Sequence, residues 1–203
     1  MKVSIIKDII IHPKKAFVEI TENEKEYFGI ALIIVGIQML VGLLEFDNIM
    51  GFLVSDTENK TIVHQFYLII SSIGGAFLMA WLVLKISKKI NKTQSNFKRV
   101  FSAIQFALIP GLLIGTPIQV IALSLFSENI TMENFFSSIS IITVINIPFI
   151  IWSIILWIMA CKQSLQLNTP NVIATAILVM IIMAVVFFPI SILLTRSPFQ
   201  GLF

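Results

Sequence analysis

The chain of 203 residues has few charged residues and one cysteine. Charged residues make up 12% of the sequence and hydrophobic residues 57%, whereas soluble domains carry about 25% charged residues. In water, such a chain would expose more apolar surface than a core of this size could bury, so a bilayer is its expected solvent. The lone cysteine, Cys161, excludes an intrachain disulfide.

The sequence also lacks the common catalytic and metal-binding motifs. It contains no His-Glu-x-x-His motif, no Gly-x-Ser-x-Gly motif and no phosphate-binding loop. His12 and His64 are expected on opposite sides of the membrane, where they cannot share a metal. No Asp, Glu, Lys or Arg lies within the apolar segments, which argues against a proton-coupled pump. We therefore predict a protein that is not an enzyme and that binds no cofactor or metal.

Five apolar segments are long enough to cross a bilayer, which takes about 20 residues. Helices satisfy their own backbone hydrogen bonds in lipid, and the ten-residue alternation of barrel strands is absent. We predict an all-α integral membrane fold with five transmembrane helices. Their expected limits are residues 27–44, 63–84, 100–126, 139–161 and 172–194.

Lys and Arg are distributed unequally between the two ends of these spans. Twelve of the fourteen lie on the side that holds the N-terminus, and only Lys60 and Arg196 lie on the other. Because cytoplasmic loops carry the excess of Lys and Arg, we predict a multi-pass cell-membrane protein with a cytoplasmic N-terminus and an outer C-terminus.

The loop between the second and third spans is basic and has no acidic residue. It is expected at the inner membrane face, where its residues either contact anionic lipid headgroups or serve only to fix the topology. A nucleic-acid partner is not expected, since the loop has a single aromatic residue, Phe97. The candidate lipid contacts are Lys88, Lys89, Lys92, Lys98 and Arg99.

Residues 1–26 differ in character from the five-helix domain predicted for residues 27–203. Apolar residues such as Ile5 and Ile9 recur there at helical spacing, but the run is too short to cross and suits a helix lying in the interface. Pro13 is well placed as the first residue of a second helix. We predict a cytoplasmic amphipathic helical hairpin that leads into the first span.

Prolines and glycines interrupt the third and fourth spans. The spacing of Gly111 and Gly115 allows close helix approach, and Pro117 is expected to bend its helix. We expect packing within the monomer, with the second span as the partner. A homodimer face and a substrate cavity are alternatives. The residues assigned to helix packing or kinks are Pro110, Gly111, Gly115, Pro117 and Pro148.

Three amides within the spans, Gln105, Gln119 and Asn146, are candidates for a polar site. Amides in lipid prefer to hydrogen-bond another helix, so one interpretation treats them as interhelical links. The alternative is that they line a polar cavity that a solute crosses.

The sequence "HPKKAF" followed by five spans resembles the Yip1 superfamily in its short prokaryotic form. The third span, "FKRVFSAIQFALIPGLLIGTPIQVI", is similar to that family's helix broken by Pro and Gly. The segment "IWSIILWIMACKQSLQLNTPNVIATAIL" resembles its Trp-containing helix and the turn that follows. The long N-terminus and Asp-Leu-Tyr-Gly-Pro motif of eukaryotic members are absent, so their links to Rab GTPases are not carried over.

The resemblance implies a non-enzymatic integral membrane protein that organises the membrane or acts as a scaffold. Its expected partners are membrane lipids and either another membrane protein or a second copy of the chain. The alternative function is a small permease or transporter subunit for a neutral or lipid-like solute, working through the kinked third and fourth spans.

Overall fold

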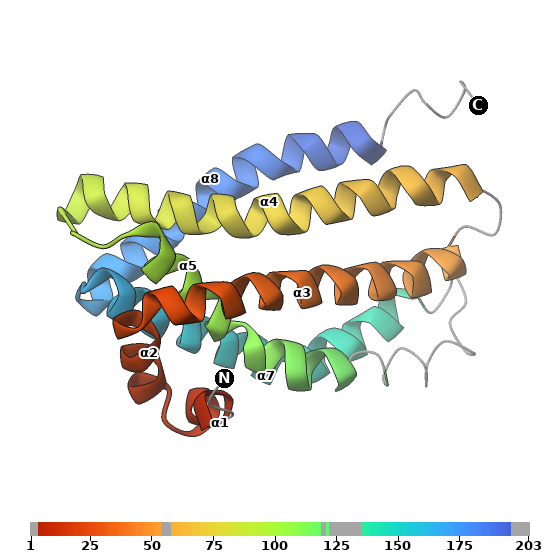
Figure 1. Ribbon diagram of the computed structural model, residues 1–203. Coiled ribbons are helices and arrows are strands. Elements are labelled where there is room, and N and C mark those ends of the chain that lie inside the picture. The colour runs from red at the N-terminus through yellow and green to blue at the C-terminus, as the bar shows by residue number, and fades with distance from the viewer. Residues whose placement is uncertain (1–3, 54–57, 119–120, 122–134, 196–203) are drawn as a thin grey trace.

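Helices make up almost all of the described chain (Figure 1). The computed structural model describes residues 4–53, 58–118, 121 and 135–195, and no strand occurs among them. The α-helices are α1 (Ser4–Ile11), α2 (Pro13–Glu22), α3 (Glu24–Leu53), α4 (Glu58–Asn91), α5 (Phe97–Ala107), α7 (Phe135–Leu165) and α8 (Thr169–Thr195), and a π-helical turn, η1 (Gly111–Gly115), lies between α5 and α7.

Within the described residues, five helical segments are long and apolar enough to cross a membrane, which agrees with the predicted number of spans. The helices extend beyond the predicted apolar limits. α3 already begins at Glu24, and α4 continues past Leu84 to Asn91. Lys88 and Lys89 lie in the last turn of α4, where positive charge is favourable beside the helix dipole. The polar ends of the helices therefore continue the apolar spans instead of forming loops.

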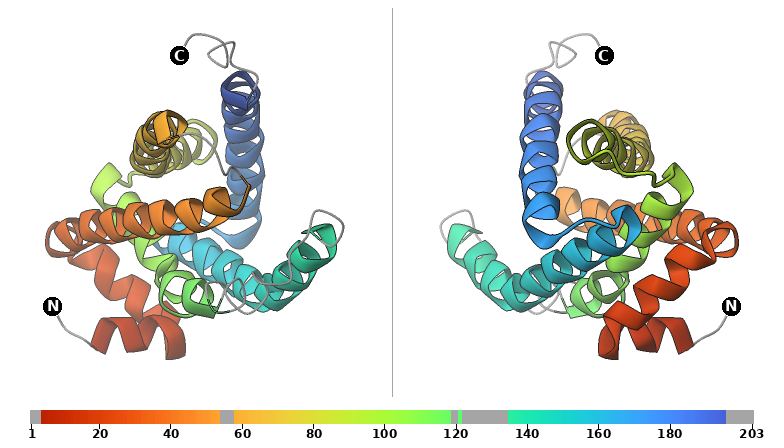
Figure 2. Two further views of the ribbon diagram at one scale, coloured as in Figure 1. Left: turned by 90° about the vertical axis from the view of Figure 1, so that its right-hand side faces the viewer. Right: turned by 90° about the vertical axis from the view of Figure 1, so that its left-hand side faces the viewer.

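α5 lies at the centre of the bundle. Its main neighbours are α2, α3, α4 and α7, whereas α8 packs against α4 and α7 (Figure 2). Every residue of α5 from Val100 to Ala107 is buried. In the third span 56% of the residues are buried, compared with 17–28% in the other four. The buried residues of α5 include the polar Ser102 and Gln105 as well as apolar side chains, so this helix is enclosed by its neighbours on all sides.

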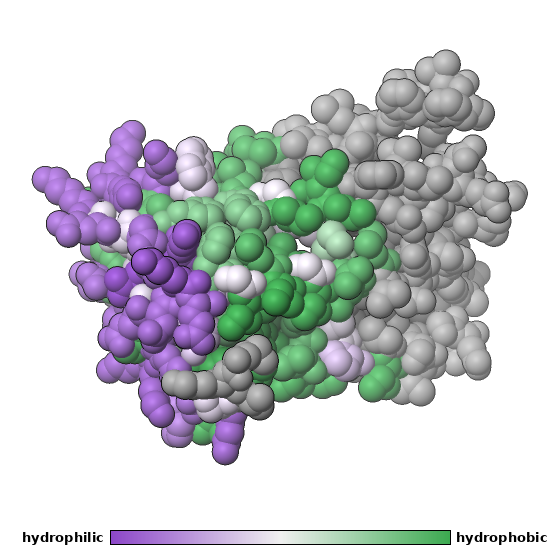
Figure 3. Space-filling view, in the orientation of Figure 1, coloured by the Kyte–Doolittle hydropathy of each residue, from purple (hydrophilic) through white to green (hydrophobic). Residues whose placement is uncertain are grey.

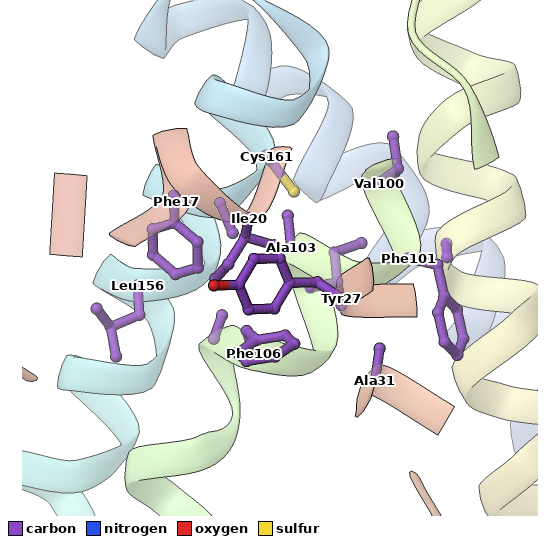
Figure 4. Packing of buried hydrophobic residues seen from close by; sticks show 14 of the residues in the cluster. Phe17, Ile20, Tyr27, Ala31, Val100, Phe101, Ala103, Phe106, Leu156 and Cys161 are labelled. Carbon is purple, nitrogen blue, oxygen red and sulfur yellow. The ribbon is translucent and has the colours of Figure 1, made fainter. Parts of the chain in front are cut away.

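Aromatic rings join α5 to α3 and α4, and Figure 4 shows Tyr27 of α3 beside Phe106 of α5. The Phe101 ring centroid lies 5.5 Å from that of Phe28 and 4.8 Å from that of Phe77. Phe106 meets Tyr27 nearly perpendicular to it, with the two centroids 5.4 Å apart. Each such pair contributes about 0.5–1.5 kcal/mol beyond the burial of its area, so these contacts position α5 between the first two spans.

The two short N-terminal helices cover one end of the bundle. They are separated at His12, and Pro13 begins α2, because its missing N–H would have no partner in the first turn. α2 packs against α5 and α7. The buried apolar side chains of the pair are Ile5, Ile9, Ala16, Phe17 and Ile20.

The apolar side of this pair packs against protein. α2 contacts α5 and α7, which present apolar side chains at the same end. Tyr27 strengthens the contact, since its hydroxyl donates a hydrogen bond of 2.9 Å to Glu19 Oε1 of α2. The position of residues 1–26 in the membrane interface stays a prediction.

The third span is interrupted between its two prolines, where residues Gly111 to Gly115 form the π-helical turn. Pro110 and Pro117 have no N–H to donate, so each removes a bond that a regular α-helix would make. The Thr116 N–H donates to the carbonyl oxygen of Gly111, five residues earlier, which is the π-helical pattern. The interruption expected from the prolines thus takes the form of a π-helical turn. In the fourth span, α7 continues through its own proline.

The two glycines of this turn face α7. A Cβ atom at Gly111 would lie 3.4 Å from Ser153 Oγ, and one at Gly115 would lie 3.7 Å from the Cβ of Phe149. We expected the second span as the partner, but the structure places α7 there. A Cβ atom at Gly75 of α4 would meet nothing within 4 Å. The extra residue per turn of a π-helix rotates the following residues about the axis, which redirects the glycines.

We predict that Gly115→Leu destabilises the protein and that Gly75→Leu does not. A leucine at position 115 would force α7 away, and overpacking of this kind costs about 1–3 kcal/mol. A leucine at position 75 would point into open space within the single chain. The measurement is the free energy of unfolding in mixed micelles. Equal stability of the two variants would contradict the close approach of η1 and α7.

Candidate functional site at the basic end of the bundle

Polar side chains gather at one end of the molecule, and apolar side chains cover its middle (Figure 3). We call this the basic end. It comprises α1, α2, the connection 92–96, the first turns of α3 and α5, and the last turns of α4 and α7. Because this end carries most of the charged residues of the described chain, it is the candidate surface for recognition outside the hydrocarbon.

The connection 92–96 ties the end of the fourth span to the start of the third. Thr93 Oγ1 donates a hydrogen bond of 2.7 Å to the carbonyl oxygen of Leu165. Ser95 Oγ donates one of 2.6 Å to the carbonyl oxygen of Ser164. The last carbonyls of a helix have no partner within it, so the two hydroxyls supply donors that α7 lacks.

Asn96 joins the start of α5 to the start of α3. Its Oδ1 accepts a hydrogen bond of 3.0 Å from the backbone N–H of Arg99, which caps α5. Its Nδ2 lies 2.8 Å from both carboxylate oxygens of Glu24. One side chain therefore fixes the N-terminal ends of the first and third spans relative to each other.

Two helices at this end finish on left-handed residues that are not glycine. Lys92 follows α4 with φ of 53°, and Gln166 follows α7 with φ of 56°. The Leu167 N–H then donates to the carbonyl oxygen of Lys162, as in a Schellman motif. These turns redirect the chain sharply and keep the ends of the spans close to one another.

The five residues predicted to contact lipid lie at this end, but Arg99 is less exposed than the four lysines. Lys88, Lys89, Lys92 and Lys98 are exposed, and Lys98 Nζ lies 5.5 Å from the centre of the Phe28 ring. Arg99 is partly buried, and its Nε is buried without a hydrogen-bond partner. The four lysines are free to meet headgroups, whereas part of the guanidinium of Arg99 faces the packed interior.

Of the three predicted amides, the structure describes the side chain of Gln105 alone. Gln105 is 1% exposed, and its Oε1 has no hydrogen-bond partner. Gln119 lies outside the described residues, and so does the side chain of Asn146. The polar cavity and the interhelical link therefore both stay predictions, with Gln105 the one residue placed inside the bundle.

Sequence reasoning missed the side chains that connect the helix ends. Asn96 could have been found, because an Asn just before an apolar helical segment is a typical N-cap. Thr93 and Ser95 carry no such signal, since their acceptors are backbone carbonyls far away in the sequence. Other buried polar atoms without a hydrogen-bond partner are Ser87 Oγ, Asn91 Nδ2, Ser102 Oγ and Trp157 Nε1.

The described chain offers few groups for catalysis or metal binding. No group of three or more His, Cys, Asp or Glu side chains that could hold a metal ion occurs in its described residues. Cys161 is buried with 1% exposure, so its thiol is shielded from reagents and substrates. The basic end presents more exposed lysines than carboxylates, so the interaction that it favours is binding of anions.

We predict that Ser95→Ala lowers the free energy of unfolding by about 1–3 kcal/mol, because the buried Ser164 carbonyl would lose its donor. Gln94→Ala in the same connection should change it by less than about 0.5 kcal/mol, since Gln94 is exposed. Chemical unfolding in mixed micelles measures both variants. A Ser95→Ala protein as stable as the Gln94→Ala protein would refute the structural role of this bond.

The comparisons with known proteins agree with this architecture. The family model described as the Yip1 domain matches residues 7–190. That match includes α2, all five spans and the basic end. No curated protein and no solved structure matches the chain. Since the match extends over most of the 203 residues, the chain belongs to the Yip1 domain family of membrane proteins.

Proposed function

We propose that this protein is a non-enzymatic membrane organiser or scaffold of Yip1 type. The observation that carries the proposal is the unequal packing of its spans. Outside the centre, large apolar side chains remain open, such as Ile33 with 63% of its surface exposed and Ile70 and Val185 with 68% each. In a bilayer these faces contact lipid chains or other transmembrane helices. Broad outward faces suit a protein that arranges lipids or holds partners.

The proposed orientation places the basic end in the cytoplasm of a cell-membrane protein. The support is the excess of Lys and Arg at that end. α1 and α2 would then lie at the inner membrane interface, with their packed sides toward the bundle and exposed residues such as Lys14 toward water and headgroups. An odd number of spans leaves the C-terminus outside.

The basic end is also the proposed contact with anionic lipid. The exposed lysines Lys88, Lys89, Lys92 and Lys98 would each contribute about 1 kcal/mol beside an anionic surface. Such a contact is a nonspecific electrostatic attraction to the anionic leaflet and requires no binding pocket. It would hold the basic end against the membrane while the outward faces of the spans contact their neighbours.

The permease alternative gains no support from the described residues. This hypothesis was based on a possible polar path along the kinked third and fourth spans. At that junction the described contacts are close, since Gly111 faces Ser153 and Gly115 faces Phe149. We therefore keep the scaffold as the proposed function.

Reconstitution into vesicles at increasing protein density tests the scaffold. We expect the protein to form clusters, measured by energy transfer between labelled copies, and the vesicles to change shape as the density rises, measured by electron cryomicroscopy. Empty vesicles are the control for shape. Dispersed monomers in vesicles of unchanged shape at every density would reject the proposal. A parallel swelling assay with neutral solutes should show no protein-dependent uptake.

Tags at the two termini test the orientation. We expect an impermeant reagent to label a C-terminal tag on intact cells and to reach an N-terminal tag only after the cells are permeabilised. The physical reason is the distribution of Lys and Arg across five spans. If both tags react on intact cells, or neither does, the number of crossings is wrong.

A further inference from the structure

A groove between the first turns of α2 and the helix α7 combines positive charge with an apolar wall. It is open, has a volume of about 730 Å³, and is lined by His12, Pro13, Lys14, Lys15, Val18 and Met159. The groove is an open depression in the surface, so it suits a ligand that stays partly exposed. The lining has two lysines, His12 and no acidic residue, and the nearby carboxylate of Asp8 offsets only one of the two ammonium charges. The groove is therefore complementary to an anion.

The polar part of the groove contains side chains that can donate hydrogen bonds to a ligand. Lys14 and Lys15 are exposed, and the side chain of His12 does not cap α2. Lys15 Nζ lies 3.9 Å from Asp8 Oδ2, a long contact at a lysine whose side chain is 73% exposed. The N–H groups of Lys14 and Lys15 have no acceptor within the helix, whereas the Ala16 N–H donates to the carbonyl oxygen of His12. These two N–H groups add to the positive potential there. Ammonium groups beside a helix N-terminus are suited to a phosphate group.

The apolar part of the groove lies deeper along the bundle. Met159 precedes the end of α7 at Leu165 by six residues, which is about 9 Å along the helix axis. The headgroup region on one side of a bilayer is about 5–8 Å thick. With the end of α7 at the membrane surface, the groove would reach from headgroup depth at the lysines to the edge of the hydrocarbon at Met159.

We propose that this groove binds one anionic glycerophospholipid, with its phosphate beside Lys14, Lys15 and the α2 N-terminus and its upper acyl chain against Val18 and Met159. The proposal goes beyond the general attraction of the basic end, because it requires a saturable site with a stoichiometry of one. The combination of cationic and apolar lining favours a lipid over a free phosphate, since free phosphate makes no use of the apolar wall.

The test is native mass spectrometry of the full chain in detergent, titrated with phosphatidylglycerol and, separately, with phosphatidylcholine. We expect one tightly held phosphatidylglycerol and weaker binding of phosphatidylcholine. Lys14→Gln combined with Lys15→Gln should weaken phosphatidylglycerol binding about tenfold or more, because two cationic contacts are lost. Lys14→Arg combined with Lys15→Arg should restore it, which also shows that this region folds.

The matched control is Lys25→Gln combined with Lys162→Gln, which removes the same charge from exposed positions at the same end, outside the groove and apart from the four lysines proposed to contact the leaflet. It should weaken binding less than about twofold. Equal losses in the two glutamine pairs would show a diffuse attraction and overturn the site. Inorganic phosphate that displaces the lipid at micromolar concentration would overturn the lipid assignment. These outcomes are independent of whether the protein clusters or reshapes vesicles, so the site and the scaffold function can fail separately.

Discussion

The arrangement of the described helices depends on the burial of α5. In lipid, the polar backbone must satisfy its hydrogen bonds within its own helix. This requirement makes every span helical, but it does not determine how the helices pack against one another. α5 decides this, because α2, α3, α4 and α7 all pack against it. Phe101 and Phe106 fill the spaces between those helices. The other spans can then leave most of their surface to lipid without losing their common core.

The spans and their number follow from the sequence because the bilayer imposes a single length and polarity on every crossing. The packing of the spans does not follow in the same way. An apolar face is equally suited to lipid and to protein. The residues of α1 and α2 therefore do not indicate which of the two covers their apolar sides. The same ambiguity applies to Gly111 and Gly115, whose spacing indicates close approach but does not name the partner. Tertiary contacts settle both questions.

The basic end shows a second limit of sequence reasoning. The sequence alone shows that its lysines lie outside the hydrocarbon, because charged side chains are costly there. The bonds that hold this end together are made to backbone carbonyls, as at Ser95 and Ser164, and any helix end presents such carbonyls. The groove is likewise formed by segments far apart in the chain, since α2 supplies the cations and Met159 comes from α7. Only a folded chain brings these together.

The peripheral position of α8 has a consequence for biosynthesis. Its main contacts are with α4 and α7, and it is not among the main neighbours of α5. A nascent chain that has released the fourth span from the ribosome therefore already carries every principal partner of its central helix. Assembly in the membrane can begin before translation ends, and the last span can join a core that already exists.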